Sequence, residues 1–419
     1  MQRGIPAVAA ALGLSLILTA CGGDTKNETK ETPKPSESSS STEETPAASG
    51  SITLWVDETR INDFQDVVKK FETERGVTVE VVQKASGDIR TEFIQQVPTG
   101  EGPDVIIGAH DWLGEFVSNG VVAPVELGDK ASAFAEASVK AFAYDGVNYG
   151  VPYAVESIAL VRNTKLAAEV PATFDELVKA AQDSGAKYPV LLQQGPDGDA
   201  YHMYPLQTSF GAPVFKSGAD GSYTAEVGMG GENGVKFAQY LAKLGKDKVL
   251  DAAIDGAKAT EAFVAGESPF MITGPWNIAA FQEAGIDVAV SAIPSAGGQP
   301  AQPFVGVQGA YISNKSANPI LANDFVVNYL STEEAADTIY TSGNRIPALT
   351  AAADKIDNEI TKAFAEVAGT AAPMPSIPEM GAVWGFWGST EVAIIKGDVD
   401  PATAWNDMVK NIETNISEG

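Results

Sequence analysis

Residues 102–115, with the sequence GPDVIIGAHDWLGE, contain a short apolar run that ends in polar and aromatic side chains. Residues 105–107 predict a buried strand, and Asp111 and Trp112 follow it closely, before a segment of helical character. Ligands of open α/β sheets bind just beyond the carboxyl ends of strands. A carboxylate accepts hydrogen bonds from hydroxyl groups and an indole offers a flat apolar face, so Asp111 and Trp112 are a candidate binding pair. The alternative is that Asp111 caps the following helix and Trp112 packs against it.

Strands and helices alternate before this segment. The patterns predict strands at residues 52–56 and 77–82, a helix from residue 61 that Gly76 ends, and a helix at residues 88–97. This βαβαβ order favours a doubly wound sheet with helices on both faces.

A second series of strands and helices follows residue 152 and includes a capping box, from Thr173 to Glu176, that opens a helix. The further strands are predicted at residues 157–161, 189–192, 269–272, 286–290 and 304–312. The further helices are predicted at residues 234–244, 257–265, 321–330, 333–340, 351–367, 381–395 and 402–416.

The composition indicates a globular protein. Of the 419 residues, 44% are hydrophobic and 20% are charged, which is typical of a chain with roughly two to three domains. The net charge of −27 argues against nucleic acid as a partner, and against binding of an anionic membrane by the folded body. Cys21 is the single cysteine, so neither a disulfide nor a thiolate metal site can form within one chain. We expect no metal and no cofactor.

The N-terminus has the pattern of a processing signal. Arg3 precedes an apolar stretch, residues 4–17, that is too short to span a bilayer comfortably. The tetrapeptide that ends in Cys21, LTAC, resembles a bacterial lipobox, which implies cleavage before Cys21 and a lipid on its sulfur. The alternative is an ordinary signal peptide with an incidental cysteine. Residues 22–49 are rich in Ser, Thr, Glu, Lys and Pro and predict a disordered tether.

Aromatic and acidic residues recur where loops meet helices and strands. The rim of a pyranose carries hydroxyl groups and its faces carry C–H groups, so a sugar site combines acidic acceptors with aromatic rings. Core packing is the competing interpretation for any tryptophan, and it is the better one for Trp55 and Trp405. We expect His110 to be structural, whereas His202 is a candidate to line the site. The aromatic candidates are Trp112, Tyr201, Trp276, Trp384 and Trp387, and the acidic candidates are Asp57, Glu58, Asp111, Glu156 and Asp199.

Paired carboxylates also serve glycosidases, so a tethered glycoside hydrolase is an alternative function. The separation of two carboxylates cannot be read from a sequence. No nucleophile elbow, P-loop, HExxH or GxGxxG pattern supports another chemistry.

Several blocks of the chain together resemble the maltose/maltodextrin-binding proteins of bacterial ABC importers. They occur in the order of that family and span nearly everything after the tether. The blocks are residues 55–58 (WVDE), 68–72 (VKKFE), 102–111 (GPDVIIGAHD), 152–156 (PYAVE), 274–276 (GPW), 303–307 (PFVGV) and 374–380 (MPSIPEM).

The resemblance implies a two-lobed periplasmic-binding-protein-like fold, with two doubly wound α/β domains joined by hinge strands and a ligand cleft between them. The division that it implies is a signal peptide at residues 1–20, a lipidated tether at 21–50, an N-lobe at 51–155 and 296–342, and a C-lobe at 156–295 and 343–419.

The resemblance also implies roles for individual residues. Asp111, Glu156 and either Asp57 or Glu58 would bind sugar hydroxyls, and Asp199 falls near another acidic contact. Tyr201, Trp276 and Trp384 would stack on sugar rings. Further candidates are Arg60, Asp88, Gln308, Arg345 and Trp387.

This sequence departs from the best-known family pattern at four positions. Gly108 stands where an aromatic residue is expected and Trp112 where a basic one is expected, so Trp112 is a candidate to replace the missing ring. The other two departures are Gly385 and Gly388.

The sequence therefore predicts a lipoprotein, tethered to the outer face of the cell membrane, that captures maltose or maltodextrins and delivers them to an ABC permease. It is predicted not to be an enzyme. Closure of the two lobes around the sugar would supply contacts that the open form lacks. The alternatives are the same fold with another oligosaccharide, the tethered hydrolase, and a surface adhesion module.

Overall fold

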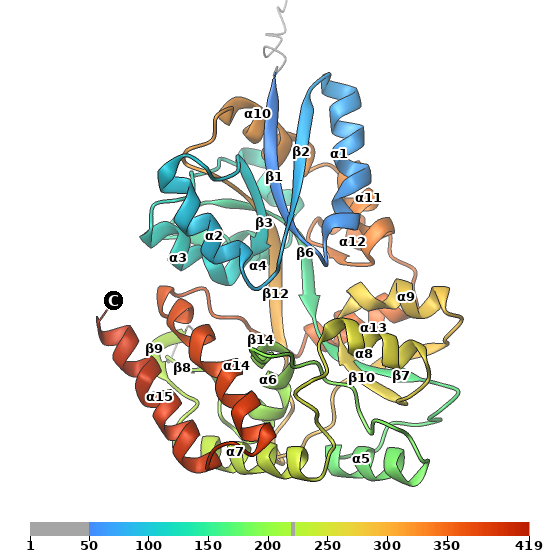
Figure 1. Cartoon of the computed structure of the whole chain (residues 1–419). Coiled ribbons are helices and arrows are strands. Elements are labelled where there is room, and N and C mark those ends of the chain that lie inside the picture. Colours follow the sequence, from blue (N-terminus) through green and yellow to red (C-terminus); the bar gives the residue numbers. More distant parts are fainter. Residues whose placement is uncertain (1–49, 219–222, 419) are drawn as a thin grey trace, which may run out of the picture. The chain divides into compact units, whose positions relative to one another are not determined.

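The computed structural model describes residues 50–218 and 223–418 (Figure 1). The predicted signal peptide, the lipidation site Cys21 and nearly all of the predicted tether lie outside these residues. None of the helices within the described residues combines the length and the apolar character that crossing a bilayer requires.

The chain opens with the predicted βαβαβ unit. It consists of β1 (Ser51–Asp57), α1 (Ile61–Arg75), β2 (Thr78–Lys84), α2 (Ile89–Gln96) and β3 (Val105–Ala109). Strand β1 pairs in parallel with both β2 and β3. Helix α1 buries Phe64, Val67, Val68 and Phe71, and it ends where Gly76 adopts a φ of 67°.

A seven-stranded sheet grows from this unit in the order β13-β6-β12-β3-β1-β2, and β14 pairs with β12. Strand β12 is antiparallel to both β3 and β6. We call this sheet and its helices the N-lobe. Its other elements are β6 (Gly150–Ser157), β12 (Phe304–Ile312), β13 (Ile346–Pro347), β14 (Ala372–Pro373), α3 (Leu113–Ser118), α4 (Glu136–Lys140), α10 (Pro319–Asn323), a π-helix (Asp324–Tyr329), α11 (Glu333–Gly343) and α12 (Thr350–Ala353).

A second, three-stranded sheet has the order β10-β7-β11, and both of its pairings are antiparallel. We call this sheet and its helices the C-lobe. Its elements are β7 (Ala159–Asn163), β10 (Phe270–Thr273), β11 (Val288–Ser291), α5 (Phe174–Asp183), α6 (Ala200–Ser209), α7 (Gly231–Lys246), α8 (Gly256–Val264), α9 (Ile278–Glu283), α13 (Glu359–Ala368), α14 (Gly381–Lys396) and α15 (Pro401–Glu418). Two short hairpins complete the chain, β4 (Ala143–Tyr144) with β5 (Val147–Asn148) and β8 (Phe215–Ser217) with β9 (Tyr223–Val227).

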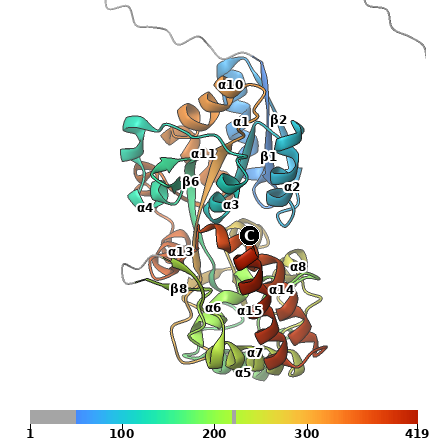
Figure 2. The ribbon, with the colours of Figure 1, turned by 90° about the vertical axis from the view of Figure 1, so that its left-hand side faces the viewer.

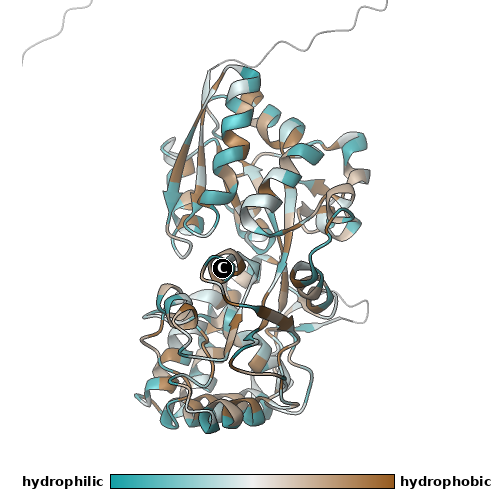
Figure 3. Ribbon diagram, turned by 90° about the vertical axis from the view of Figure 1, so that its right-hand side faces the viewer, coloured by the Kyte–Doolittle hydropathy of each residue, from teal (hydrophilic) through white to brown (hydrophobic). Residues whose placement is uncertain are grey.

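The long C-terminal helices are part of the C-lobe core. Helices α14 and α15 lie side by side and both pack on α7 (Figure 2). Trp405 of α15 is fully buried, and its indole N–H donates to the Met229 carbonyl at 2.7 Å. Trp55 of β1 is 4% exposed. Core packing is therefore confirmed for both tryptophans. In Figure 3, hydrophobic residues gather on the inner strands, and hydrophilic residues occur on the outer helices.

The chain passes from one sheet to the other through adjacent strands. Strand β6 ends in the N-lobe sheet at Ser157, and β7 begins in the C-lobe sheet at Ala159. The Ser157 hydroxyl donates to the Phe304 carbonyl at 2.9 Å, which ties β6 to the start of β12. The Phe304 ring in turn stacks on Tyr204 of the C-lobe at 3.7 Å between ring centroids. The exact residues at which the chain divides into lobes stay a prediction.

Three predicted elements differ from the structure. The strand predicted at 189–192 is reduced to one bridge between Leu191 and Met271. The helix predicted at 351–367 is broken, because the Asn358 side chain accepts hydrogen bonds from the Ile360 and Thr361 N–H groups and so starts α13 anew. The strand predicted at 157–161 is shared between β6 and β7.

Helix α6 was not predicted. Nearly all of its residues are buried, so it has no amphipathic stripe, and it contains Pro205. The capping box at Thr173 was predicted and is confirmed, with both reciprocal hydrogen bonds present.

Candidate functional site

The carboxyl end of β1 carries two carboxylates with different surroundings. Asp57 is buried; its Oδ1 accepts hydrogen bonds from the Thr59 N–H at 2.8 Å and the Thr59 hydroxyl at 2.7 Å, and Arg60 pairs with Oδ2. Burial alone would raise the pKa of Asp57, but Arg60, Thr59 and Arg345 together lower it. Glu58 is exposed and accepts from the Ser86 N–H at 2.8 Å. Asp57 therefore faces the interior, and Glu58 holds the loop at Ser86 through hydrogen bonds at the surface.

Asp57 belongs to a buried charge network of five residues, Asp57, Arg60, Asp63, Glu156 and Arg345. Arg60 Nη2 lies 3.2 Å from Glu156 Oε2, and Arg345 pairs with both Glu156 and Asp63. Burial acts to lower the pKa of Arg345, but the negative charges around it, Glu156 first, raise it overall. The network joins the end of β1, the first turn of α1 and the end of β6. Paired, desolvated groups of this kind hold one geometry.

The charge network touches the C-lobe through an aromatic ring. The Arg345 guanidinium carbon lies 5.8 Å from the Trp276 ring centroid, within the range of a cation–π contact. Trp276 lies in the 3₁₀ turn after β10 (Pro275–Asn277) and is half-buried. Arg345 is 1% exposed. Trp276 and the charge network therefore lie against each other, although they come from different lobes.

Asp111 has a buried carboxyl group that lacks a full set of partners. Its Oδ1 atom has no hydrogen-bond partner among the residues that the structure describes. Burial raises the pKa of Asp111 to about 6, against the lowering effects of Arg90 and of the Trp384 indole. Helix α3 starts after Trp112 without any side-chain cap. The alternative interpretation, that Asp111 caps the following helix, is therefore wrong. Its Oδ1 atom is a buried acceptor that could accept a hydrogen bond from a ligand.

A continuous series of rings runs through the C-lobe side of the site. Trp276 meets His202 edge to face at 6.0 Å between centroids, and His202 meets Tyr201 at 5.4 Å. Tyr201 stacks on Phe304 at 6.3 Å, and Phe304 meets Trp384 at 6.5 Å. Trp384 also acts on the Asp111 carboxyl group. Trp384 and Tyr201 of the C-lobe therefore lie near Asp111 of the N-lobe, and Trp276 is joined to them through His202.

The Tyr201 phenol lies among the acidic candidates of both lobes. Burial raises its pKa well above the usual range, and the nearby charges of Glu156, Asp199 and Asp111 raise it further, while Arg60 lowers it. The Tyr201 side chain is half-buried. Because charges act on a buried group mainly from nearby, Tyr201 lies among candidates of both lobes.

Asp199 already has protein partners. It caps α6, because Oδ1 accepts from the His202 backbone N–H at 3.0 Å, and Oδ2 accepts from Gln193 Nε2 at 2.5 Å. The His202 ring nitrogen Nδ1 lies 2.9 Å from Oδ2. Burial acts to raise the pKa of Asp199, but His202 and Gln193 lower it overall. Asp199 therefore orients His202 toward Trp276.

The remaining candidates have varied positions. Trp387 is fully buried, donates its indole N–H to Gln207 Oε1 at 3.0 Å and stacks behind Trp384 at 5.6 Å. Asp88 is exposed before α2 and makes no capping hydrogen bond. Gln308 is buried in β12, and its Oε1 atom finds no partner within the described ranges.

His110 is structural, as expected. The Val307 N–H donates to His110 Nδ1 at 3.0 Å, and Nε2 lies 2.9 Å from the Met374 carbonyl. With Nδ1 as acceptor, the neutral ring donates its Nε2 proton to that carbonyl. Burial lowers the pKa of His110 to about 4, so the ring stays neutral at physiological pH.

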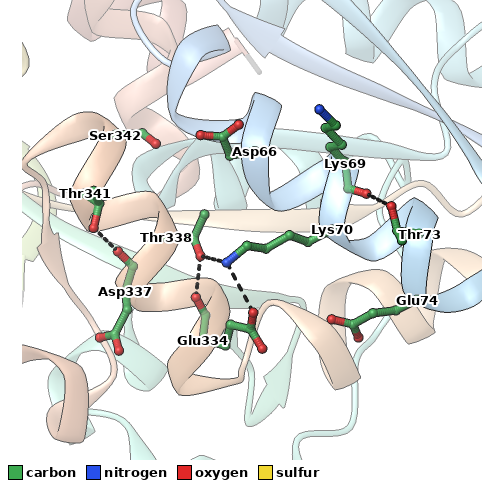
Figure 4. Close-up of a pocket in the computed structure, with 10 residues that line it drawn as sticks. All are labelled: Asp66, Lys69, Lys70, Thr73, Glu74, Glu334, Asp337, Thr338, Thr341 and Ser342. Atoms are coloured by element: carbon green, nitrogen blue, oxygen red, sulfur yellow. Dashed lines mark hydrogen bonds and ion pairs between the residues drawn. The ribbon is translucent and has the colours of Figure 1, made fainter.

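Two hollows lie apart from this site. One, with a volume of about 860 Å³, lies between α1 and α11 and is lined by charged and hydroxyl side chains (Figure 4). Lys70 crosses it to Glu334 at 3.2 Å and Thr338 at 3.0 Å. The other, of about 1090 Å³, lies between α4 and the end of α6. Neither is lined by a predicted ligand residue.

Comparison with known proteins decides the family. Residues 66–368 match the family of bacterial extracellular solute-binding proteins. The chain belongs to this family. It is therefore an extracellular binding protein and not an enzyme, and the hydrolase alternative is wrong.

Individual relatives of this solute-binding protein resemble it along nearly its whole length. A galactooligosaccharide-binding protein of Bacillus subtilis is 29% identical, and the alignment covers 96% of this chain and 95% of the relative. A maltooligosaccharide ABC transporter solute-binding lipoprotein of Streptococcus pneumoniae is 28% identical over the same shares. The solved structure of the Thermus thermophilus maltotriose binding protein with maltotriose has a TM-score of 0.80 and 31% identity, covering 87% of this chain and 100% of that one. The predicted fold class is confirmed.

Sequence reasoning missed two residues of this solute-binding protein's site. Phe304 links Tyr201 to Trp384, and its one sequence signal is its place after Pro303 at the start of a strand. Asp63 binds Arg345 inside the charge network. An acidic residue in the first turn of a helix is common on solvated surfaces, so the sequence held no signal for its burial.

Proposed function

We propose that this solute-binding protein captures an oligosaccharide outside the cell and delivers it to the permease of an ABC transporter. The observation that carries the proposal is a series of rings that includes the half-buried Trp276, Tyr201 and Trp384 and reaches a buried carboxyl group, that of Asp111, through Trp384. One oxygen of Asp111 has no partner among the described residues. Flat apolar faces beside hydrogen-bond acceptors suit the two surfaces of a sugar ring. Relatives named for galactooligosaccharide and maltooligosaccharide binding support the same class of ligand.

Within that class, we infer a preference for maltodextrins. The solved relative with a TM-score of 0.80 holds maltotriose, and its identity of 31% matches or exceeds that of the sequence relatives. The second candidate is a galactooligosaccharide, because the Bacillus subtilis protein of that name is 29% identical over nearly the full chain.

The proposed contacts divide by chemistry. Trp276, Tyr201 and Trp384 stack on sugar faces, and Trp112 adds a ring from the N-lobe. Asp111 and Gln308 accept hydrogen bonds from hydroxyls with the oxygens that lack partners in the described chain. Glu156, Asp57 and Arg60 reach the sugar as parts of the charge network. Further proposed contacts are Glu58, Asp88, Asp199 and Arg345, and Trp387 contributes by supporting the Trp384 ring, on which it stacks.

The proposed mechanism is a population shift between open and closed forms. A sugar that bridges Asp111 of the N-lobe and the rings of the C-lobe stabilises the closed form through contacts that an open form lacks. The strands β6 and β12 carry the chain between the lobes, so the hinge motion passes through them. The permease would recognise the closed arrangement.

We also propose a lipid anchor on Cys21 and attachment to the outer face of the membrane. The LTAC sequence at residues 18–21 supports it, as does the Streptococcus pneumoniae relative that is named a lipoprotein. Mass spectrometry of the protein extracted from membranes tests the anchor: a diacylglyceryl group on Cys21 is expected, and an intact signal peptide or an unmodified cysteine contradicts it.

Calorimetric titration tests the function. The mature chain is titrated in parallel with maltotriose and with a galactooligosaccharide of equal length, and binding of maltotriose is expected to be the tighter. Tighter binding of the galactooligosaccharide would overturn the maltodextrin preference alone. An absence of binding heat with both sugars, together with unchanged tryptophan fluorescence, would overturn the oligosaccharide proposal.

A further inference from the structure

Two indole rings of the candidate site, those of Trp112 and Trp276, lie against a glycine that precedes them closely in the chain. An added Cβ at Gly108 would lie 2.2 Å from Cζ3 and 2.4 Å from Cε3 of Trp112. An added Cβ at Gly274 would lie 2.0 Å from Cζ3 and 2.2 Å from Cη2 of Trp276. Real Cβ contacts are never so short. A close approach of a candidate indole ring to a glycine therefore occurs in both lobes, at Gly108 near the end of β3 and at Gly274 directly after β10.

Backbone conformation does not explain the glycine at either position. Gly274 has a φ of −98° and a ψ of −177°, an extended conformation that any residue adopts. Gly108 does not have a positive φ, and it pairs with Gly309 inside the sheet. An alanine at either position would suit the backbone conformation, and the three heavy atoms nearest to its Cβ would all belong to the indole ring.

Both rings keep part of their surface accessible. Trp112 and Trp276 are half-buried, and Trp112 packs against the apolar clusters of both lobes. The glycine sets how closely each ring approaches the backbone, and a methyl group in its place would displace the ring by more than 1 Å before the two reached contact distance, about 3.5 Å.

We propose that Gly108 and Gly274 are positioning residues of the saccharide site, each fixing the height of one indole ring. This inference rests on the proposed function. It also accounts for the departure from the family pattern: the glycine at position 108 is what allows the ring of Trp112 to occupy the place of the missing aromatic side chain. Binding sites must hold their side chains within about 0.5 Å of the productive geometry, so a ring displaced by more than 1 Å should weaken binding.

A double-mutant cycle tests the proposal, with maltotriose as the probe. Gly108→Ala is expected to weaken binding at least tenfold in the wild-type background. In the Trp112→Ala background, where no ring remains to be displaced, the same alanine is expected to change affinity less than twofold. An equal loss in both backgrounds would show that the glycine acts through the backbone and would overturn the proposal, and so would wild-type affinity of Gly108→Ala.

A matched control exists in the same sheet. Gly150 of β6 also lies under a ring, because its added Cβ would be 2.4 Å from Cδ1 of Phe142. Phe142 is fully buried in the core and not part of the site. Gly150→Ala is expected to lower the unfolding midpoint while leaving maltotriose affinity within twofold. A loss of affinity equal to that of Gly108→Ala would show that strand damage alone impairs binding.

A readout without ligand separates this inference from the proposed function. Gly274→Ala is expected to change the near-ultraviolet circular dichroism and the acrylamide quenching of the free protein, since the Trp276 ring moves. Spectra identical to those of the wild type would overturn the inference even if maltotriose binds. If the spectra change while neither version binds any oligosaccharide, the ring positions are as inferred but the proposed function fails, and the saccharide role of the glycines fails with it.

Discussion

Lowering the pH through 6 should weaken oligosaccharide binding, because the acceptor on Asp111 becomes protonated. Burial raises the pKa of this carboxyl group to about 6 in the free protein. Hydroxyl groups that donate to the carboxylate stabilise its charged form, so the bound complex has a lower pKa than the free protein. Binding near pH 6 therefore releases a proton, and acid competes with the sugar.

The size of the effect follows from the ionised fraction. With a pKa of about 6, nearly all Asp111 carboxyls are charged at pH 7.5 and about one in eleven at pH 5. Affinity should therefore fall roughly tenfold between these pH values, which is about 1.4 kcal/mol. The pKa of Asp57 is held below its usual range, and that of His110 is about 4, so neither titrates within this interval.

Calorimetry at several pH values measures the effect, and Asp111→Asn is the matched control. The amide has the same shape without a titrating proton, so its affinity should be flat between pH 5 and 7.5 and about tenfold or more below wild type at pH 7.5. Titrations at pH 6 in buffers of different ionisation enthalpy should show release of about half a proton. Equal pH dependence in wild type and Asp111→Asn would refute the reasoning.

Three further predictions concern stability and ring function. The folded-state pKa of Asp111 lies above its unfolded value of 3.8, so the charged carboxylate destabilises the fold above pH 6, and this penalty disappears toward pH 4. Asp111→Asn should therefore raise the free energy of unfolding, measured by urea titration at pH 7.5, by up to about 3 kcal/mol. An unchanged free energy of unfolding would contradict the burial argument. Arg345→Met leaves the buried Asp63 without its charge partner and removes one of the two arginines paired with Glu156. It should cost about 3–5 kcal/mol of unfolding free energy, whereas a loss under 1 kcal/mol would show that the charge network contributes little. Trp384 is half-buried and Trp387 is fully buried, so Trp384→Ala should abolish most maltotriose affinity with little loss of stability, whereas Trp387→Phe should lower stability with little loss of affinity. Thermal melts and maltotriose titrations of both variants measure these effects. A loss of affinity in Trp387→Phe and of stability in Trp384→Ala would contradict the assignment.

The sequence predicted those elements whose signals are local. Helix α1 has apolar residues at helical spacing and a glycine with positive φ at its end, and both are readable in one window. The capping box at Thr173 is a pattern of four residues. Helix α6 is buried on nearly every side, and such a helix has no periodic signal. The antiparallel pairing of β7, β10 and β11 depends on partners more than a hundred residues apart, so alternating elements alone do not specify it.

For the candidate site, residue types were predictable and partners were not. Asp111 and Trp112 stand out because they follow a buried strand, and the structure places them beside the rings of the C-lobe. That Asp57 and Glu156 share two arginines could not be read from the sequence, because the network joins positions as distant as 57 and 345. The seating of Trp112 on Gly108 likewise appears only when the backbone is built.

A crystal structure of the protein grown with maltotriose tests the central claim most directly. We expect the sugar to lie between the lobes, with glucose rings against Trp276, Tyr201 and Trp384 and a hydroxyl group within hydrogen-bond distance of Asp111 Oδ1. A sugar bound elsewhere, such as in the groove between α1 and α11, or a sugar that leaves Asp111 without a partner, would contradict the account.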